Sequence, residues 1–153
     1  MKTALNILNI INITLFCILI FVNSCAQKPT SIISLYEDSL RYAEKENKNL
    51  IVLFGADWCP DCKALDRMLV SPEIKSLIQK NYIILKVDVG RFDKNLDLDE
   101  KLGHPIGKGI PALVILAPNP LKIVASTEGG EFSNASRMSQ DQVFAYLKKF
   151  GTN

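Results

Sequence analysis

The sequence has few of the side chains that metal sites need. Four of its 153 residues are cysteines and one is a histidine, His104. A structural zinc site takes four ligands, usually cysteine or histidine. Besides Cys59 and Cys62, the candidates are His104 and two cysteines, Cys17 and Cys25, that lie in or beside an N-terminal apolar segment. The composition therefore argues against structural zinc, and it leaves His104 as an isolated loop residue.

The chain also lacks a strong excess of charge of either sign. Its formal net charge at pH 7 is +2, which is too close to zero to indicate nucleic acid or an anionic surface as a partner. No histidine or methionine cluster is present, and no internal repeat occurs. These absences direct attention to the cysteines.

The N-terminal segment has no acidic residue before Glu37. A positive start at Lys2 precedes a hydrophobic region over about residues 10–22, and this pattern predicts a signal peptide of residues 1–24. A small residue, Ser24, directly precedes Cys25, which resembles a bacterial lipoprotein cleavage site. Cys25 would then be the lipidated first residue, and residues 25–31 would form a tether. Asn23 makes this cleavage site a loose one.

Two alternatives to the lipoprotein signal stay open. The mostly apolar segment of about nineteen residues, 4–22, could just span a bilayer as an uncleaved anchor, although the asparagines in it would be costly there. Simple secretion is the other alternative. All three predict a domain outside the cytoplasm, and the preferred one places it on the periplasmic side of a bacterial membrane.

The run Trp58-Cys59-Pro60-Asp61-Cys62 carries the chemistry. An apolar, β-branched stretch at 50–54 predicts a buried strand before it, and apolar residues at helical spacing predict a helix after it. Pro60 suits the first helical position. Cys59 would lie at the helix N-terminus, where free N–H groups and the helix dipole favour a thiolate. Cys59 is therefore the expected nucleophile, and the more buried Cys62 the resolving thiol.

Cysteine usage agrees with a redox role for this pair. If the signal is removed at Cys25, the mature chain holds no other cysteine except the lipidated one. An exported protein without further cysteines has no structural disulfide to form, so the pair is free for exchange.

The segment 55–63, Gly-Ala-Asp-Trp-Cys-Pro-Asp-Cys-Lys, resembles the active site of the thioredoxin superfamily, most nearly the thioredoxin-like domains of bacterial periplasmic thiol:disulfide interchange proteins. A second match, Gly109-Ile110-Pro111 before an apolar run, lies far down the chain. The resemblance covers roughly residues 35–150. It implies that Pro111 is cis and faces the cysteines, and that Ile110 and Pro111 pair with an extended substrate, with Trp58 at the rim.

One position departs from the family pattern. Many thioredoxins bury an aspartate six residues before the first cysteine, where this chain has Leu53. The proton of Cys62 must then move through water or a nearby group, such as Asp57, Asp61 or Lys63. Pro60 and Asp61 would also tune the pair, because a carboxylate between the cysteines opposes thiolate formation at Cys59.

The remaining elements predict an α/β domain over residues 32–153, with a central mixed sheet covered by helices on both sides. Further helices are expected from residue 32 to near Asn47, after Ser71, over about 95–102 and after Ser139. Further strands are expected over 82–89, 112–117 and 121–127. Residues 131–138 look polar and irregular. Residues 90–109 could form a substrate-facing lip, but a solvated surface insertion is preferred.

The sequence thus predicts a membrane-anchored thiol:disulfide oxidoreductase that needs no cofactor. Its substrates would be protein or small-molecule disulfides or dithiols, with a membrane thiol protein as a candidate electron donor. The carboxylate of Asp61 favours the reductase direction. The alternative is a soft-metal protein that binds and delivers copper through the same pair. An interaction module with redox-inert cysteines agrees less well with the position of Cys59.

Overall fold

The computed structural model of the chain describes residues 31–127 and 130–151. The predicted signal peptide, the lipidation site at Cys25 and all of the tether except Ser31 lie outside these residues. The helices and strands come in the order α2 (Ile32–Lys45), β1 (Asn49–Gly55), α3 (Pro60–Leu69), α4 (Pro72–Asn81), β2 (Tyr82–Asp88), α5 (Leu96–Lys101), β3 (Ala112–Pro118), β4 (Leu121–Ser126) and α6 (Gln140–Lys149). Two short 3₁₀ helices, η1 (Pro105–Lys108) and η2 (Ala135–Arg137), complete the order.

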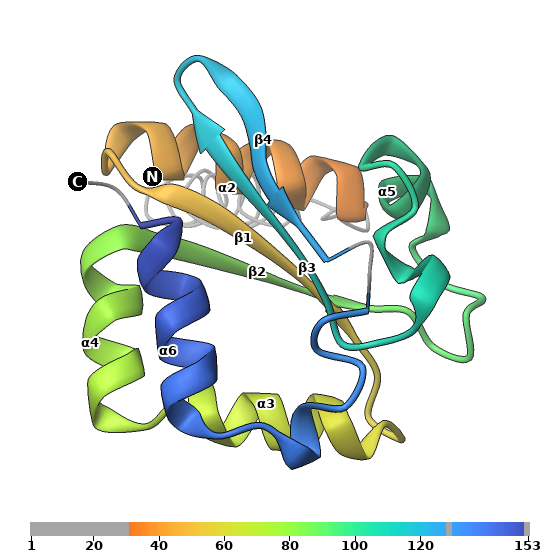
Figure 1. Cartoon of the computed structure of the whole chain (residues 1–153). Helices are drawn as coiled ribbons and strands as arrows, with labels where there is room; N and C mark the ends of the chain where they lie inside the picture. The colour runs from red at the N-terminus through yellow and green to blue at the C-terminus, as the bar shows by residue number, and fades with distance from the viewer. Residues whose placement is uncertain (1–30, 128–129, 152–153) are drawn as a thin grey trace, which may run out of the picture. The chain divides into compact units, whose positions relative to one another are not determined.

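The four strands form one mixed sheet in the order β2-β1-β3-β4 (Figure 1). β1 runs parallel to β2, with Leu53 opposite Lys86, and antiparallel to β3. The helices α3 and α4 lie between β1 and β2 in the chain, as the crossover of a parallel pair requires. The predicted α/β fold with a central mixed sheet is confirmed.

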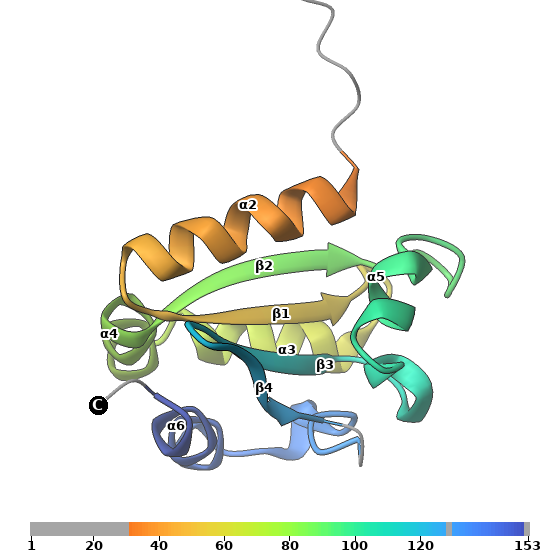
Figure 2. The same cartoon turned by 90° about the horizontal axis from the view of Figure 1, so that it is seen from above.

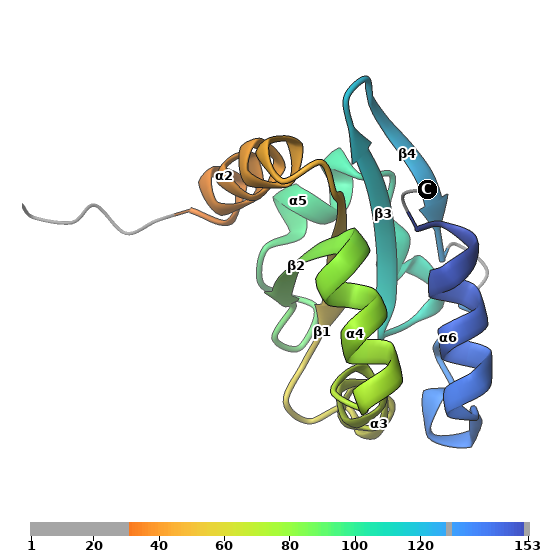
Figure 3. The same cartoon turned by 90° about the vertical axis from the view of Figure 1, so that its left-hand side faces the viewer.

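The side chains of β1 alternate between two separate cores. Leu50, Val52 and Phe54 pack with residues of α2, α5 and η1 on one face. Ile51 and Leu53 pack with α3, α4 and α6 on the other. Figures 2 and 3 show α2 and α6 on opposite sides of the sheet. Because both faces are covered, the central strands are apolar throughout, as parallel-type buried strands are.

Serine side chains cap the starts of two helices, of which only the cap at Ser139 was predicted from the sequence. Ser31 Oγ accepts a hydrogen bond from the backbone N–H of Ser34 at the start of α2. Ser139 and Gln142 form a reciprocal capping box at the start of α6. Such caps satisfy N–H groups that have no partner within the helix.

One expectation about irregular segments was incomplete and another was wrong. Residues 131–138 form turns and the short helix η2 with mostly exposed polar side chains, as expected, but Phe132 and Ala135 are buried against the α6 face of the sheet. Residues 90–109 are not simply a solvated insertion, because Leu98, Leu102 and Ile106 belong to the opposite core. In both segments a few apolar side chains among many polar ones fill space that the four strands leave open.

Among the residues that the structure describes, no helix is both long enough and apolar enough to cross a membrane.

Candidate active site

The cysteine motif lies where β1 leads into α3. After Gly55 the chain turns, and the backbone N–H of Cys59 donates to the carbonyl of Ala56 at 3.1 Å. Cys59 is the N-cap of α3 and Pro60 is its first residue, as predicted. The backbone N–H of Cys62 donates to Cys59 Sγ at 3.0 Å. A donor at that distance stabilises negative charge on the sulfur, so the local geometry favours a Cys59 thiolate.

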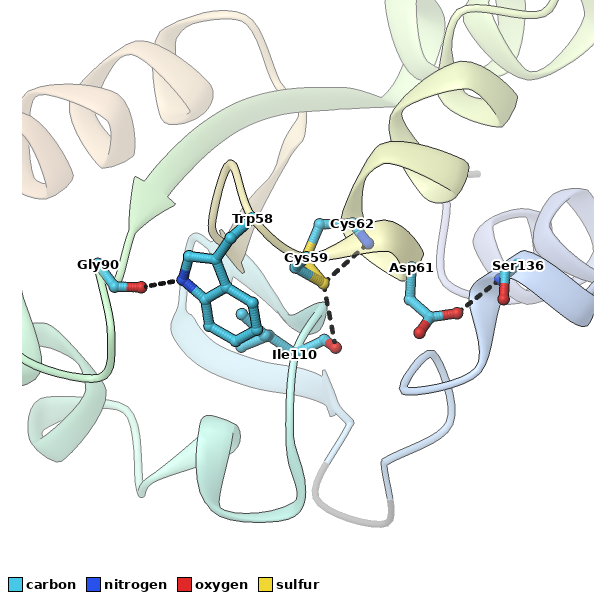
Figure 4. Close-up of a disulfide and its surroundings, with 7 residues drawn as sticks. All are labelled: Trp58, Cys59, Asp61, Cys62, Gly90, Ile110 and Ser136. Atoms are coloured by element: carbon cyan, nitrogen blue, oxygen red, sulfur yellow. Dashed lines mark hydrogen bonds between the residues drawn. A yellow bond between two sulfur atoms is a disulfide. The ribbon is translucent and has the colours of Figure 1, made fainter.

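Cys59 and Cys62 form a disulfide, with their Cα atoms 5.3 Å apart (Figure 4). Cys62 was expected to be the more buried of the two, and this is wrong. Cys59 is 3% exposed and Cys62 is 8% exposed. Cys62 also lines a pocket whose lining does not include Cys59.

The second motif lies against the disulfide. The peptide bond between Ile110 and Pro111 is cis, as the resemblance implied. The carbonyl oxygen of Ile110 lies 3.6 Å from Cys59 Sγ. β3 begins one residue after Pro111 and pairs with β1. The sheet therefore brings together two motifs that are 51 residues apart in the sequence.

The loop before this motif is held by a buried carboxylate. Asp99, in α5, is buried and accepts hydrogen bonds from the backbone N–H of Ile106 at 3.2 Å and from the ring of His104 at 3.0 Å. His104 thus contacts a structural carboxylate and lies at the start of the loop rather than beside the sulfurs. Its place in a loop agrees with the prediction, but it is paired with Asp99 and is not isolated.

Trp58 lies at the rim of the disulfide and is half exposed. Its indole N–H donates to the carbonyl of Gly90 at 2.6 Å, in the turn that follows β2 (Figure 4). Its ring also contacts the ring of Phe92, with centroids 6.0 Å apart. Sequence reasoning did not identify Gly90 and Phe92 as neighbours of the site. The only signal in the sequence was that Phe92 is an aromatic residue among the charged residues that follow β2.

Asp61 does not face the sulfurs. Its Oδ1 accepts a hydrogen bond from the backbone N–H of Ser136 at 2.8 Å, and Figure 4 shows the carboxylate directed toward that residue and away from the disulfide. This hydrogen bond, with the nearby charge of Arg137, lowers the pKa of Asp61 below its ordinary value. The carboxylate thus adds a negative charge to the first turn of α3 and also joins α3 to η2.

A pocket of about 150 Å³ reaches Cys62 from the side of β2. Its lining includes Leu53, Pro111 and an ion pair between Lys86 Nζ and Asp66 Oδ1 at 2.5 Å. Asp57 and Lys63, two of the expected proton-transfer groups, also line it, whereas Asp61 does not. Asp66 and Lys86 were not identified from the sequence, because their meeting depends on the register of β2 beside α3.

Gly55 permits the close approach of Cys62 to β1. A Cβ at this position would lie 3.3 Å from Cys62 Sγ, which is tighter than an ordinary contact.

Within residues 31–127 and 130–151, no three His, Cys, Asp or Glu side chains gather into a group suited to a metal ion.

Comparison with known proteins places this geometry in a family. Residues 31–118, more than half of the chain, match the family model described as thioredoxin-like. The chain belongs to the thioredoxin-like family. The resemblance seen in the two sequence motifs is thereby confirmed.

Solved structures agree with this assignment. A disulphide isomerase from Xylella fastidiosa Temecula1 is 34% identical, with a TM-score of 0.74 over 83% of this chain and 95% of that one. The C-terminal domain of DsbD from Neisseria meningitidis, in its reduced form, has a TM-score of 0.56 over 78% of this chain and 96% of its own. At 18% identity, that likeness concerns the fold alone.

Among curated relatives, anterior gradient protein 3 from Xenopus tropicalis is 30% identical over 105 residues. The match covers 68% of this chain and 58% of that protein. The thioredoxin-like chain therefore spans less than two thirds of the length of this relative.

Proposed function

We propose that this thioredoxin-like protein is an extracytoplasmic thiol:disulfide oxidoreductase that reduces disulfides of proteins or small molecules. One observation carries the proposal: the Cys59–Cys62 disulfide lies at the N-terminus of α3, with the carbonyl of Ile110 beside it. A disulfide at a helix N-terminus can be opened to a stabilised thiolate, and this is the attacking form in exchange.

The reaction proceeds in two exchange steps. The thiolate of Cys59 attacks one sulfur of the substrate disulfide, whose S–S bond breaks, and the second substrate sulfur leaves as a thiolate. Cys62 then loses its proton and attacks Cys59, which releases the first substrate sulfur and forms the Cys59–Cys62 disulfide. Two electrons pass from the protein dithiol to the substrate. A thiol protein, for which a membrane protein is the candidate, must reduce the pair again.

Other residues position the substrate or adjust the pair. Ile110 and Pro111 lie where an extended substrate segment can pair with the backbone before β3, in the manner of strand addition. Trp58 offers apolar contact at the rim. Pro60 begins α3, and Asp61 adds a negative charge to the first turn of this helix, which disfavours the Cys59 thiolate and therefore the reduced form. Because a less stable reduced form is the better electron donor, this charge supports the reductase direction.

The reduction potential of the full-length protein tests this proposal. The protein is equilibrated with glutathione or dithiothreitol buffers, with Cys59→Ser as the variant that cannot form the disulfide. A potential of about −230 mV or lower supports a reductase, whereas a value near −120 mV identifies a disulfide-forming oxidant. If no disulfide forms and the protein is isolated with bound copper, the enzyme proposal fails and the metal-binding alternative replaces it.

We also propose that Cys25 is lipidated and holds the domain at the periplasmic side of a membrane. The support is the residue pattern alone, since this segment lies outside the described residues. Metabolic labelling with a radioactive fatty acid tests the proposal. Labelled wild type and unlabelled Cys25→Ser support it. An unlabelled protein in the membrane fraction indicates an uncleaved anchor, and an unlabelled soluble protein indicates simple secretion.

A further inference from the structure

The turn between β2 and α5 is fixed by its own polar groups. Asp88 Oδ1 accepts a hydrogen bond from the backbone N–H of Gly90 at 2.9 Å, and Asp93 Oδ1 accepts one from the backbone N–H of Arg91 at 2.8 Å. The amide of Asn95 donates to the carbonyl of Asp88 at 2.7 Å. The turn therefore has a defined shape in which polar side chains point back to the backbone.

Phe92 is the exception within this turn. It is 43% exposed, and its φ of 64° lies in the left-handed region. A bulky residue is unusual there, because its Cβ crowds the backbone, and glycine or asparagine would adopt the conformation more easily. Phe92 belongs to neither core cluster of the domain. A strained and exposed aromatic ring does little for stability, and strained positions of this kind concentrate at functional sites.

The ring of Phe92 continues the apolar rim of the active site. Trp58 lies between the turn and the disulfide: its indole N–H is bonded to Gly90, and its ring contacts Phe92. Figure 4 shows the indole spanning the distance from Gly90 to Cys59 and Ile110. The two half-exposed rings form one surface, here termed the Trp58–Phe92 surface, and it begins beside the reactive sulfur.

We infer that Phe92 is a specificity-determining residue and that the Trp58–Phe92 surface binds a large apolar side chain next to the cysteine of a polypeptide substrate. The inference rests on the proposed function and names its substrate class. An extended substrate held by Ile110 and Pro111 would project the side chains that flank its cysteine over the rim. An aromatic or aliphatic side chain would bury both rings, whereas a small or polar one would leave them in water.

The test compares two disulfide-linked peptides that differ only at the residue beside one cysteine, which is phenylalanine in one and serine in the other. The readout is the ratio of kcat/KM for the phenylalanine peptide to kcat/KM for the serine peptide. For full-length Phe92→Gly we expect this ratio to fall about tenfold, the size of effect that a lost apolar contact gives. Phe92→Tyr should restore most of the preference.

Two features keep the test decisive. Glycine adopts a φ of 64° without strain, so Phe92→Gly should fold at least as well as wild type. Leu121→Gly serves as the matched control and should leave the ratio unchanged, because Leu121 is an exposed apolar residue at the start of β4, where it pairs with Pro118 at the end of β3 that is far from Pro111.

Each outcome has one meaning. An unchanged ratio in Phe92→Gly overturns the inference while the proposed function stands. A wild type that reduces neither peptide overturns the proposed function itself. If Phe92→Gly shifts the sedimentation mass and leaves the ratio unchanged, the surface covers a second copy of the chain and the inference is wrong.

Discussion

The carboxylate of Asp61, between the two cysteines, bonds to the backbone N–H of Ser136, 75 residues further along the chain. The bond joins the first turn of α3 to η2, and it lowers the pKa of Asp61. Asp61 is therefore fully ionised at neutral pH. A negative charge in the first turn of α3 is then a constant feature of the site rather than one that titrates near neutral pH.

Asp61→Asn should make the Cys59–Cys62 pair more oxidising. The asparagine oxygen can still accept the hydrogen bond from the backbone N–H of Ser136, so the substitution removes the charge and keeps the contact between α3 and η2. Without that charge the Cys59 thiolate is more stable, and the potential should rise by about 10–30 mV, which corresponds to about 1 kcal/mol for a two-electron couple. Equilibration with glutathione buffers measures the shift.

Glu73→Gln is the matched control for this substitution. Glu73 also lies in the first turn of a helix, α4. This helix begins after the end of α3, which is about 15 Å long, so Glu73 is remote from the cysteines in the chain. The potential of this control should match that of wild type. A potential of Asp61→Asn equal to that of Glu73→Gln would remove Asp61 from the set of tuning residues.

Asp88→Ala should reduce stability at neutral pH but not in acid. The N–H of Gly90, and then Lys94, lower the pKa of Asp88 in the folded protein. A group whose pKa is lowered on folding contributes stability above its ordinary pKa, and this contribution is lost as the pH falls through the folded value. Urea midpoints of Asp88→Ala and wild type should therefore differ at pH 7 and converge as the pH falls below the ordinary pKa of 3.8 and through the lowered folded value.

The emission of Trp58 gives a second readout of this variant. The chain has a single tryptophan, and its indole N–H is bonded to Gly90, whose own N–H is held by Asp88. Loosening of the turn should therefore change the Trp58 emission at pH 7. Identical spectra and a stability difference that persists in acid would contradict this role of Asp88.

The sequence was sufficient for the parts of the site that depend on local patterns. A cysteine before a proline at the start of a helix, and an apolar run on each side, predict the position of Cys59 without knowledge of the fold. The pairing of Ile110 with the cysteines came from the family resemblance, because no local rule links two segments that are 51 residues apart.

Contacts that depend on register and packing could not be predicted. Asp66 and Lys86 meet only because β2 pairs with β1 so that Lys86 lies opposite Leu53, beside α3. Phe132 is buried although its neighbours in sequence are polar, so no periodic pattern marks it. The prediction of the relative burial of Cys59 and Cys62 was wrong for a similar reason: the residue that contacts Cys59 Sγ, Ile110, lies just before β3 and far away in the sequence.

Gly55→Ala should destabilise the protein through the cysteine pair. The added methyl group would lie 3.3 Å from Cys62 Sγ, so the sulfur or the start of α3 must shift. Overpacking of this kind costs about 1–3 kcal/mol. Urea denaturation of the oxidised protein measures the loss.

Gly107→Ala provides the control, because a Cβ at that position meets no atom within 4 Å and its φ is not positive. It should leave the midpoint close to that of wild type. If the urea midpoints of both alanine variants match that of wild type, the protein can accommodate a methyl group between β1 and Cys62. The close approach of Cys62 to β1 then has no energetic consequence.

Lys86→Met should slow the second exchange step, in which Cys62 attacks Cys59. The chain has Leu53 where many relatives place a buried carboxylate, and yet Cys62 must lose a proton before it can attack. The pocket beside Cys62 offers a path, because the Asp66 carboxylate lines it and is held by Lys86 at 2.5 Å. Positioned acid–base groups accelerate proton-transfer steps by about 10²–10⁴-fold. Because water can replace part of this acceleration, we expect the rate of the second exchange step to fall by about tenfold.

The rate of that step is measured by rapid mixing of the reduced protein with a disulfide substrate and acid trapping of the mixed disulfide, with Cys62→Ser as the variant that cannot resolve. Asp66→Asn should show the same loss as Lys86→Met, and for both the loss should shrink as the pH rises and Cys62 ionises unaided. Lys122→Met, an exposed lysine on β4, is the control. Equal rates from pH 6 to pH 9 in all variants would mean that the Cys62 proton leaves directly to water, and that the ion pair serves only to join α3 to β2.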